Sequence, residues 1–174
     1  MNVFFLHTNP RESAKLMVDR HLPKMIVESA QILSNCFTLE QLSSAPTSQK
    51  GNARKHSYPN HPCCKWAKRS KSNMMWVIDN AFGMQMEREH RFGSEYHFSL
   101  HFIDWCRDNI HQSLAPTGPL TRPEMAFNGC DEYKNPEDVV GSYRLFYAHD
   151  KQFDSRGRPM DIYTNRDKPN FWST

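Results

Sequence analysis

The stretch Asp19-Arg20-His21-Leu22-Pro23-Lys24, continued by Glu28 and Gln31, decides how this chain is organised. Steps of three and four residues place four polar side chains in one row along one face of an α-helix: His21, Lys24, Glu28 and Gln31. The opposite face carries an apolar stripe typical of a helix that packs on a core: Met25, Ile26, Ala30, Leu33 and Phe37. The row admits two interpretations, an ordinary solvated face with a surface salt bridge, or groups that move protons or hold an anion.

The composition favours one domain with a small, aromatic-rich core. The chain has 174 residues, of which 38% are hydrophobic and 12% aromatic. A net charge of +3 is compatible with a nucleic-acid partner but is weak support for one. No apolar run reaches the length of a membrane span, and the apolar start Met1–Leu6 is too short for a signal peptide, so we expect no membrane partner.

Cysteine usage and the absence of common motifs narrow the chemistry. The five cysteines are an odd number without a secretory signal, which indicates reduced thiols in a cytoplasm. Their spacing relative to the histidines matches no zinc-ligand pattern, so we expect no metal site. The chain holds no G-x-G-x-x-G, P-loop or Gly-x-Ser-x-Gly motif, and we expect no cofactor.

Caps and periodicity predict a mainly α, compact single domain of five or six helices. Helical segments are expected over residues 10–17, 23–37, 60–82, 83–92, 98–110 and 135–147, with a further short helix capped by Thr121. Residues 42–59 read as a mobile basic loop within a helical domain of residues 1–147. Residues 148–174 are polar and lack periodicity, so we expect an irregular tail that wraps the surface or stays loose.

A second informative stretch begins at Asn60-His61-Pro62. His61 stands at a helix start, where free N–H groups favour phosphate. Ser70 and Asn73 lie within an aromatic stripe with Trp66, so they either satisfy each other in the core or face a ligand pocket. Glu87 and Arg91 form a plausible helical ion pair before Gly93, and Arg144 is able to reach a carboxylate or a phosphate.

Together these stretches resemble a family of small, uncharacterised bacteriophage proteins, which implies a host-cytoplasmic location. The match runs in the same order from residue 1 to about residue 147. It rests on Asp19, Arg20, His21, Lys24, Met25, Glu28, Ala30, Gln31, Leu33, Asn60-His61-Pro62-Cys63, Trp66, Ser70, Asn73, Trp76, Arg91-Phe92-Gly93, Leu120-Thr121, Ala126, Asp131-Glu132-Tyr133-Lys134 and Tyr143-Arg144.

A more distant resemblance is to the pyrimidine-dimer DNA glycosylases of the phage endonuclease V type. These compact helical proteins break an N-glycosidic bond in damaged DNA and then nick the strand. They carry Arg-Glu-Leu-Pro-Arg where this chain reads Arg20-His21-Leu22-Pro23-Lys24, which implies that Arg20 and Lys24 grip the DNA backbone. The chain departs from them twice, because their catalytic glutamate falls on His21 and their nucleophile, the amine of an N-terminal threonine, is replaced by Met1-Asn2.

Two functions follow from these observations. The first is a DNA glycosylase-like enzyme that acts on a base or an N-glycosidic bond, in which Asp19 or Glu28 stabilises charge on the sugar or activates a nucleophile and His21 shuttles a proton. Its expected substrate-binding residues are Arg20, Lys24, Gln31, Asn60, His61, Trp66, Ser70, Asn73, Arg91 and Arg144. The second is a non-catalytic phage protein that binds nucleic acid or a host protein through basic surfaces at residues 50–56 and 65–71.

Overall fold

The computed structural model describes residues 1–173, and these form a helical protein in which no β-strand occurs. The seven α-helices are α1 (Pro10–Lys15), α2 (His21–Ser34), α3 (Leu39–Ser43), α4 (Pro62–Ala67), α5 (Lys71–Phe92), α6 (Ser99–Asp108) and α7 (Val139–Asp150). Short 3₁₀-helices lie at Ile110–Gln112, Asp131–Tyr133 and Asn170–Ser173. The expected mainly α class is confirmed, with more helices than the five or six expected.

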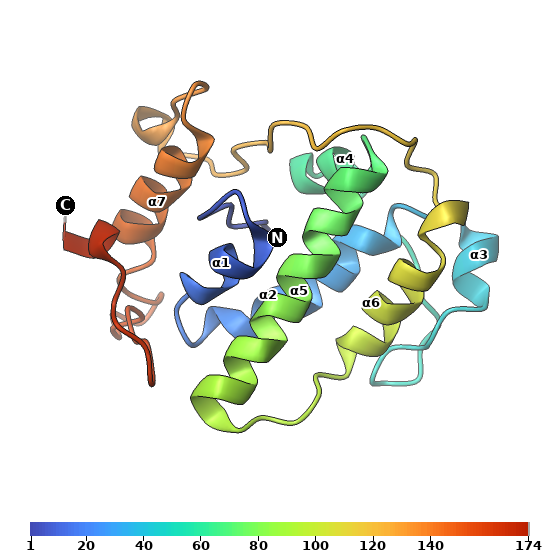
Figure 1. The fold of residues 1–174 in the computed structure, drawn as a ribbon, viewed down its shortest axis with the longest axis horizontal. Helices are drawn as coiled ribbons and strands as arrows, with labels where there is room; N and C mark the ends of the chain where they lie inside the picture. Colours follow the sequence, from blue (N-terminus) through green and yellow to red (C-terminus); the bar gives the residue numbers. More distant parts are fainter. Residues whose placement is uncertain (174) are drawn as a thin grey trace.

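Helices α2 and α5 form the centre of the molecule. In Figure 1, α5 runs across the front with α2 behind it, and α1 and α6 lie on either side of α5. Leu22, Ile26 and Leu33 of α2 are fully buried in the same core as Val77 and Ala81 of α5. None of the helices in residues 1–173 is long and apolar enough to cross a membrane.

Helix α2 begins at His21, two residues earlier than expected, and ends at Ser34. Pro23 lies in its first turn, where its missing N–H leaves no hydrogen bond unmade. The polar row divides by burial, because His21 is buried, Glu28 and Gln31 are partly buried and Lys24 is exposed. The apolar stripe faces the core, as the sequence predicts.

The prediction of one helix from residue 60 to 82, followed by a separate segment over 83–92, was wrong. The chain turns between Ala67 and Lys71 instead, because the Ser70 hydroxyl accepts a hydrogen bond from the Asn73 N–H (3.1 Å) and starts α5 there. Helix α5 then continues through Gly83, where a side chain would come within about 3 Å of Ala14 and Arg11 on α1. Gly83 therefore marks where α1 and α5 cross rather than a helix end.

The short helix expected after Thr121 is also absent. Residues 116–121 run along the α4–α5 turn, and Thr121 donates its N–H to the Asn73 amide oxygen (2.8 Å). Ser70 donates to the Pro119 carbonyl (2.8 Å), and the Trp66 indole donates to the Thr121 carbonyl (3.1 Å). These buried polar groups thus hold a loop against the core, which decides between the two readings left open for Ser70 and Asn73.

The C-terminal part of the chain wraps around the helical core. Helix α7 begins at Val139, four residues after the expected start, because the Asp138 carboxylate caps it by accepting from the Gly141 N–H (2.8 Å). Residues 151–168, here called the strap, then lie beside α1 and the start of α2, at the left of Figure 1. The Tyr163 hydroxyl donates to the Leu16 carbonyl (2.8 Å), and the Asp19 N–H donates to the Ile162 carbonyl (3.0 Å).

Candidate functional site

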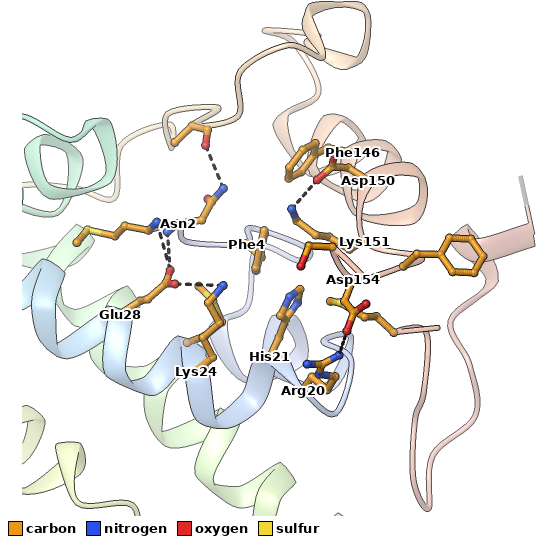
Figure 2. A pocket seen from close by; sticks show the side chains of 16 residues that line it. Asn2, Phe4, Arg20, His21, Lys24, Glu28, Phe146, Asp150, Lys151 and Asp154 are labelled. Atoms are coloured by element: carbon orange, nitrogen blue, oxygen red, sulfur yellow. Dashed lines mark hydrogen bonds and ion pairs between the residues drawn. The ribbon is translucent and has the colours of Figure 1, made fainter. Parts of the chain in front are cut away.

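A cavity of about 510 Å³ opens beside the N-terminus of the chain. Figure 2 shows that its walls come from the first residues, from α2, from the end of α7 and from the strap. Four residues expected at the site line it: Arg20, His21, Lys24 and Glu28. Further lining residues come from parts of the chain that carried no motif, among them Met1, Asn2, Phe4, Lys151 and Asp154.

The Glu28 carboxylate holds the N-terminus in the cavity. Its Oε2 accepts a hydrogen bond from the Asn2 N–H (2.8 Å) and lies 3.8 Å from the α-amino nitrogen of Met1. Its Oε1 lies 3.6 Å from the Lys24 ammonium, and only 12% of the Glu28 side chain is exposed. Asn2 is held in turn by the Ala126 carbonyl and the Tyr143 hydroxyl. The cavity therefore brings a carboxylate and two amines together.

His21 is buried on the inner wall of the cavity. Its ring stacks on Phe4 with 5.0 Å between ring centroids, and its Nδ1 lies 2.7 Å from the Tyr147 hydroxyl. Burial, aided by the charges of Lys24, Lys151 and Arg20, lowers the pKa of His21 to about 3. The imidazole is therefore neutral near pH 7, which does not favour the proton shuttle expected from the sequence.

The strap supplies counter-charges to the cationic wall. The Asp154 carboxylate accepts from the Arg20 guanidinium (2.7 Å) and from Arg158 (2.7 Å). These hydrogen bonds hold the pKa of Asp154 well below its usual range. Lys151 is paired with Asp150 at 2.5 Å and lies over the Phe146 ring. All three cations of the cavity thus have acidic partners, but the Lys24–Glu28 pair is longer (3.6 Å) and the Lys24 side chain is 64% exposed.

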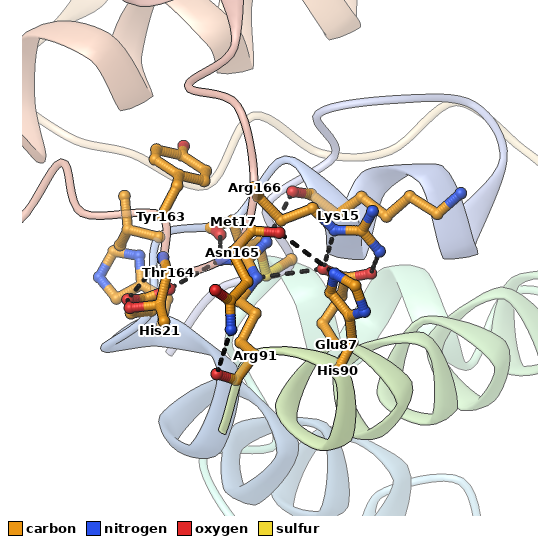
Figure 3. Close-up of polar contacts among 12 residues, drawn as sticks. Lys15, Met17, His21, Glu87, His90, Arg91, Tyr163, Thr164, Asn165 and Arg166 are labelled. Atoms are coloured by element: carbon orange, nitrogen blue, oxygen red, sulfur yellow. Dashed lines mark hydrogen bonds and ion pairs between the residues drawn. The ribbon is translucent and has the colours of Figure 1, made fainter. Parts of the chain in front are cut away.

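Asp19 is bound by Arg91 in a separate network, whose residues Arg91, Glu87, Thr164 and Arg166 are labelled in Figure 3. The Arg91 guanidinium, fully buried, donates to Asp19 (2.9 Å), to Glu87 (3.1 Å) and to the Met17 carbonyl (2.9 Å). Thr164 of the strap donates its hydroxyl to the second Asp19 oxygen (2.7 Å). Asp19 does not line the cavity, so the network binds the strap to α2 and α5 rather than presenting a carboxylate to a ligand.

The strap reaches the same network through Arg166, which donates to both Glu87 oxygens (3.0 and 2.8 Å). Burial alone raises the pKa of Glu87, but the hydrogen bonds and charges of Arg166 and Arg91 lower it overall. Glu87 therefore remains charged and bridges two arginines.

The remaining expected residues do not line the main cavity. Gln31 borders a second hollow of about 410 Å³, between α2 and the loop over residues 48–57. Trp66, Ser70 and Asn73 are buried in the α4–α5 turn, and Arg144 donates to the Leu6 carbonyl (2.9 Å). Asn60 lies with His61 in a small surface hollow.

His61 caps α4 by accepting from the Cys63 N–H (3.2 Å). Burial and then the positive charge of the Met1 amino group lower the pKa of His61, while Glu28 opposes them. His61 is thus close enough to the cavity for the charges of Met1 and Glu28 to change its pKa, although it does not line the cavity.

Several cavity residues could not be found from the sequence. Lys151 and Asp154 lie in a stretch without periodicity, and no local pattern links them to α2. The apolar start of the chain was the one available signal for Met1 and Asn2. Within residues 1–173 the structure contains no group of three or more His, Cys, Asp or Glu side chains arranged to hold a metal ion.

Comparison with known proteins gives one match. The searches of curated proteins and of solved structures found nothing similar. A family model described as pyrimidine dimer DNA glycosylase matches residues 1–91, which is more than half of the chain and includes the first residues, α2 and most of α5. The chain therefore belongs to the pyrimidine dimer DNA glycosylase family.

Proposed function

We propose that this protein is a DNA glycosylase-like enzyme that breaks an N-glycosidic bond in damaged DNA, with its chemistry in the cavity beside the N-terminus. The family match supports DNA as the substrate. One observation carries the proposal: an α-amino group and the Glu28 carboxylate lie 3.8 Å apart in a cavity bordered by Arg20, Lys24 and Lys151.

The proposed reaction begins with the amine as nucleophile. Its lone pair attacks C1′ of the deoxyribose, the C1′–N bond breaks, and the base nitrogen leaves with the bonding electrons and takes up a proton. Positive charge develops on the sugar during this step, and the Glu28 carboxylate stabilises it. Asp19 was the other carboxylate considered, but its oxygens are held by Arg91 and Thr164 outside the cavity.

The strand is nicked in a second step. The C1′–O4′ bond then breaks, O4′ takes up a proton and the nitrogen gives up its protons, which leaves an imine between the amine nitrogen and C1′. Loss of a proton from C2′ then allows the C3′–O3′ bond to break, with the electron pair leaving on the 3′ phosphate. Water hydrolyses the imine and frees the amine. If Met1 is removed from the mature chain, the same role falls to Asn2, whose nitrogen lies 2.8 Å from Glu28.

The cations of the cavity fit a phosphate backbone. Lys24 is exposed, and Arg20 and Lys151 line the same cavity. Each phosphate that such residues neutralise releases counterions from the DNA, so binding depends on salt. A phosphate that contacts Arg20 competes with Asp154 for the guanidinium.

The test is Glu28→Gln on a duplex with one thymine dimer, with Glu40→Gln on the exposed face of α3 as the matched control. We expect Glu28→Gln to reduce cleavage at the dimer by about 10²- to 10⁴-fold while the circular dichroism spectrum stays unchanged. Glu40→Gln retains the wild-type rate. If Glu28→Gln cleaves as fast as the wild type, the role given to Glu28 is wrong.

A second function is favoured by His21 at the position of the family's glutamate. Under this alternative the protein binds nucleic acid without cleaving it. The same assay separates the two functions. If the protein only binds nucleic acid, the wild type binds the duplex in a salt-dependent way but produces no cleaved strand.

A further inference from the structure

Tyr147 fixes which nitrogen of His21 carries the proton. The Tyr147 oxygen accepts a hydrogen bond from the Val18 N–H (3.0 Å) and lies 2.7 Å from His21 Nδ1. Tyr147 is fully buried, and burial raises its pKa well above the usual range, so the hydroxyl keeps its proton. Nδ1 is the one acceptor within reach of this buried O–H among the described residues, so the hydroxyl donates to Nδ1. The proton of the neutral imidazole is therefore on Nε2.

The surroundings of His21 keep the ring neutral. The side chain is 4% exposed and stacked on Phe4. The charged groups that act on it are Lys24 and Arg20 of the same segment and Lys151 from the end of α7, and all three are cations. A second positive charge at this place is thus opposed both by burial and by three neighbours.

The Nε2–H of His21 has no hydrogen-bond partner in the part of the chain that the structure describes. His21 nevertheless lines the cavity, and Figure 2 shows its ring directed from α2 toward the space between Phe4 and Lys151. The side chain as a whole is 4% exposed, so this nitrogen is among the few atoms of His21 that open to the cavity. A donor held in place but left unpaired at a cavity wall is ready for an acceptor atom of a ligand.

We propose that His21 is a substrate-binding residue that donates its Nε2–H to an oxygen of the DNA, and that Tyr147 is the positioning residue that holds it as a donor. This inference rests on the proposed function of the cavity. The cations around it select an oxygen that carries negative charge, either of a phosphate next to the target nucleotide or of the sugar ring as it opens. Position 21 thus offers a donor where a glutamate offers an acceptor, and Glu28 is the acceptor beside the α-amino group.

The protonation state is measured first, without any reaction. Protein labelled with ¹⁵N in histidine is studied by long-range ¹H–¹⁵N NMR, with His21 assigned by comparison with His21→Gln. We expect a neutral Nε2–H form that does not titrate between pH 5.5 and pH 8, and in Tyr147→Phe a changed Nδ1 shift with the fold retained. A His21 signal that titrates with a midpoint between pH 6 and pH 7 overturns the inference.

Binding is measured next, on a duplex that contains a tetrahydrofuran abasic analogue, which has no glycosidic bond to break. We expect the His21 Nε2 resonance to shift with this duplex. His21→Leu removes the donor, whereas His21→Gln keeps an N–H at the same reach. A phosphate partner predicts an affinity loss of about 10-fold or more in His21→Leu, and His21→Gln restores most of it.

If the partner is the sugar oxygen, His21→Leu should bind the duplex with wild-type affinity. Its rate of cleavage at a thymine dimer should fall about 10-fold or more. If His21→Leu matches the wild type in both affinity and rate, His21 contacts no ligand and the inference fails. The proposed function fails separately, when the wild type itself releases no product. In that case the resonance shift and the affinity series still decide the role of His21.

Discussion

Glu28 and His21 stand two helical turns apart on α2 and offer a ligand opposite properties. Seven residues of α-helix separate the two Cα atoms by about 10 Å. Glu28 accepts hydrogen bonds and faces amines, whereas His21 is neutral and has one free donor. This pairing gives the cavity one acceptor and one donor on the same helix, between the cations of Arg20, Lys24 and Lys151.

Burial of neutral His21 makes the stability of the protein sensitive to acid. The pKa of His21 is about 3 in the folded state and 6.5 for a free imidazole. Below pH 6.5 the imidazole is therefore protonated in the unfolded chain but stays neutral in the folded protein. The stabilisation is complete above pH 6.5 and is lost progressively as the pH falls toward 3. Between pH 7 and pH 5 we expect His21 alone to cost about 2 kcal/mol of unfolding free energy.

The measurement is urea unfolding at pH 7 and pH 5 for the wild type and for His21→Gln. The variant lacks the titrating group, so its stability should fall by about 2 kcal/mol less over the same interval. Equal losses in the two proteins contradict the burial of a neutral imidazole.

The polar row on α2 could be predicted from spacing, because helical geometry alone places residues 21, 24, 28 and 31 on one face. The burial of His21 could not, because it depends on Phe4 and on Tyr147, which lies 126 residues away in the sequence. The same limit applies to Asp19, whose partners Arg91 and Thr164 are equally remote. Spacing finds the face of a helix, but it does not say which distant segment covers that face.

At the scale of elements, the Arg91 network fastens the strap to the helical core. Arg91 of α5 contacts Asp19 before α2, and Glu87 of α5 contacts Arg166 of the strap. The strap in turn forms one wall of the cavity through Asp154. The network therefore supports the site without taking part in it.

Removing Arg91 should loosen the strap and the cavity wall together. Arg91→Ala leaves Glu87 and Asp19 each without one buried partner, and we expect a loss of about 3–5 kcal/mol in unfolding free energy. Arg156→Ala, an exposed arginine of the strap, should change stability by less than about 0.5 kcal/mol. Denaturant unfolding measures both, and limited proteolysis should cut Arg91→Ala first within residues 151–168.

If Arg91→Ala is as stable as Arg156→Ala, the network does not carry the strap. If Arg91→Ala is less stable but its strap is not cut earlier by the protease, Arg91 stabilises the core helices and does not hold the strap.

Element boundaries followed from the sequence where a local cap sets them. Helix α1 begins after Asn9, at Pro10, as expected. Helix α5 ends before Gly93, also as expected, and Gly93 has a φ of 60°. The turn between α4 and α5 was missed because Ser70 fits both a helix interior and a cap, and the choice is made by the contacts of Ser70 and Asn73 with residues 119–121. The mobility expected of residues 42–59 stays a prediction.

At the scale of the whole molecule, a net charge of +3 is too small to drive DNA binding by itself. The placement of the cations then matters more than their number. Arg20, Lys24 and Lys151 line one cavity, while Lys15 lies on α1 and is paired with Glu12 (2.7 Å). We therefore expect DNA to bind at the cavity rather than over the whole surface.

The salt dependence of DNA binding tests this expectation. Lys24→Ala should weaken binding to any duplex and reduce the slope of log affinity against log salt by about 1. Lys15→Ala should leave the slope unchanged. Equal slopes for the two variants would mean that the DNA does not pass over the cavity. Fluorescence anisotropy between 50 and 200 mM salt supplies the measurement.

The most direct measurement of the central claim is reductive trapping on a duplex with a single thymine dimer, followed by trypsin digestion and mass spectrometry. Borohydride reduces the imine and leaves the sugar bound to the amine that attacked it. The tryptic peptide Met1–Arg11 contains no lysine, so an adduct on it identifies the α-amino group. The account predicts that adduct with damaged DNA and none with an undamaged duplex. An adduct on Lys24 or Lys151, or no adduct while the strand is cut, would contradict it.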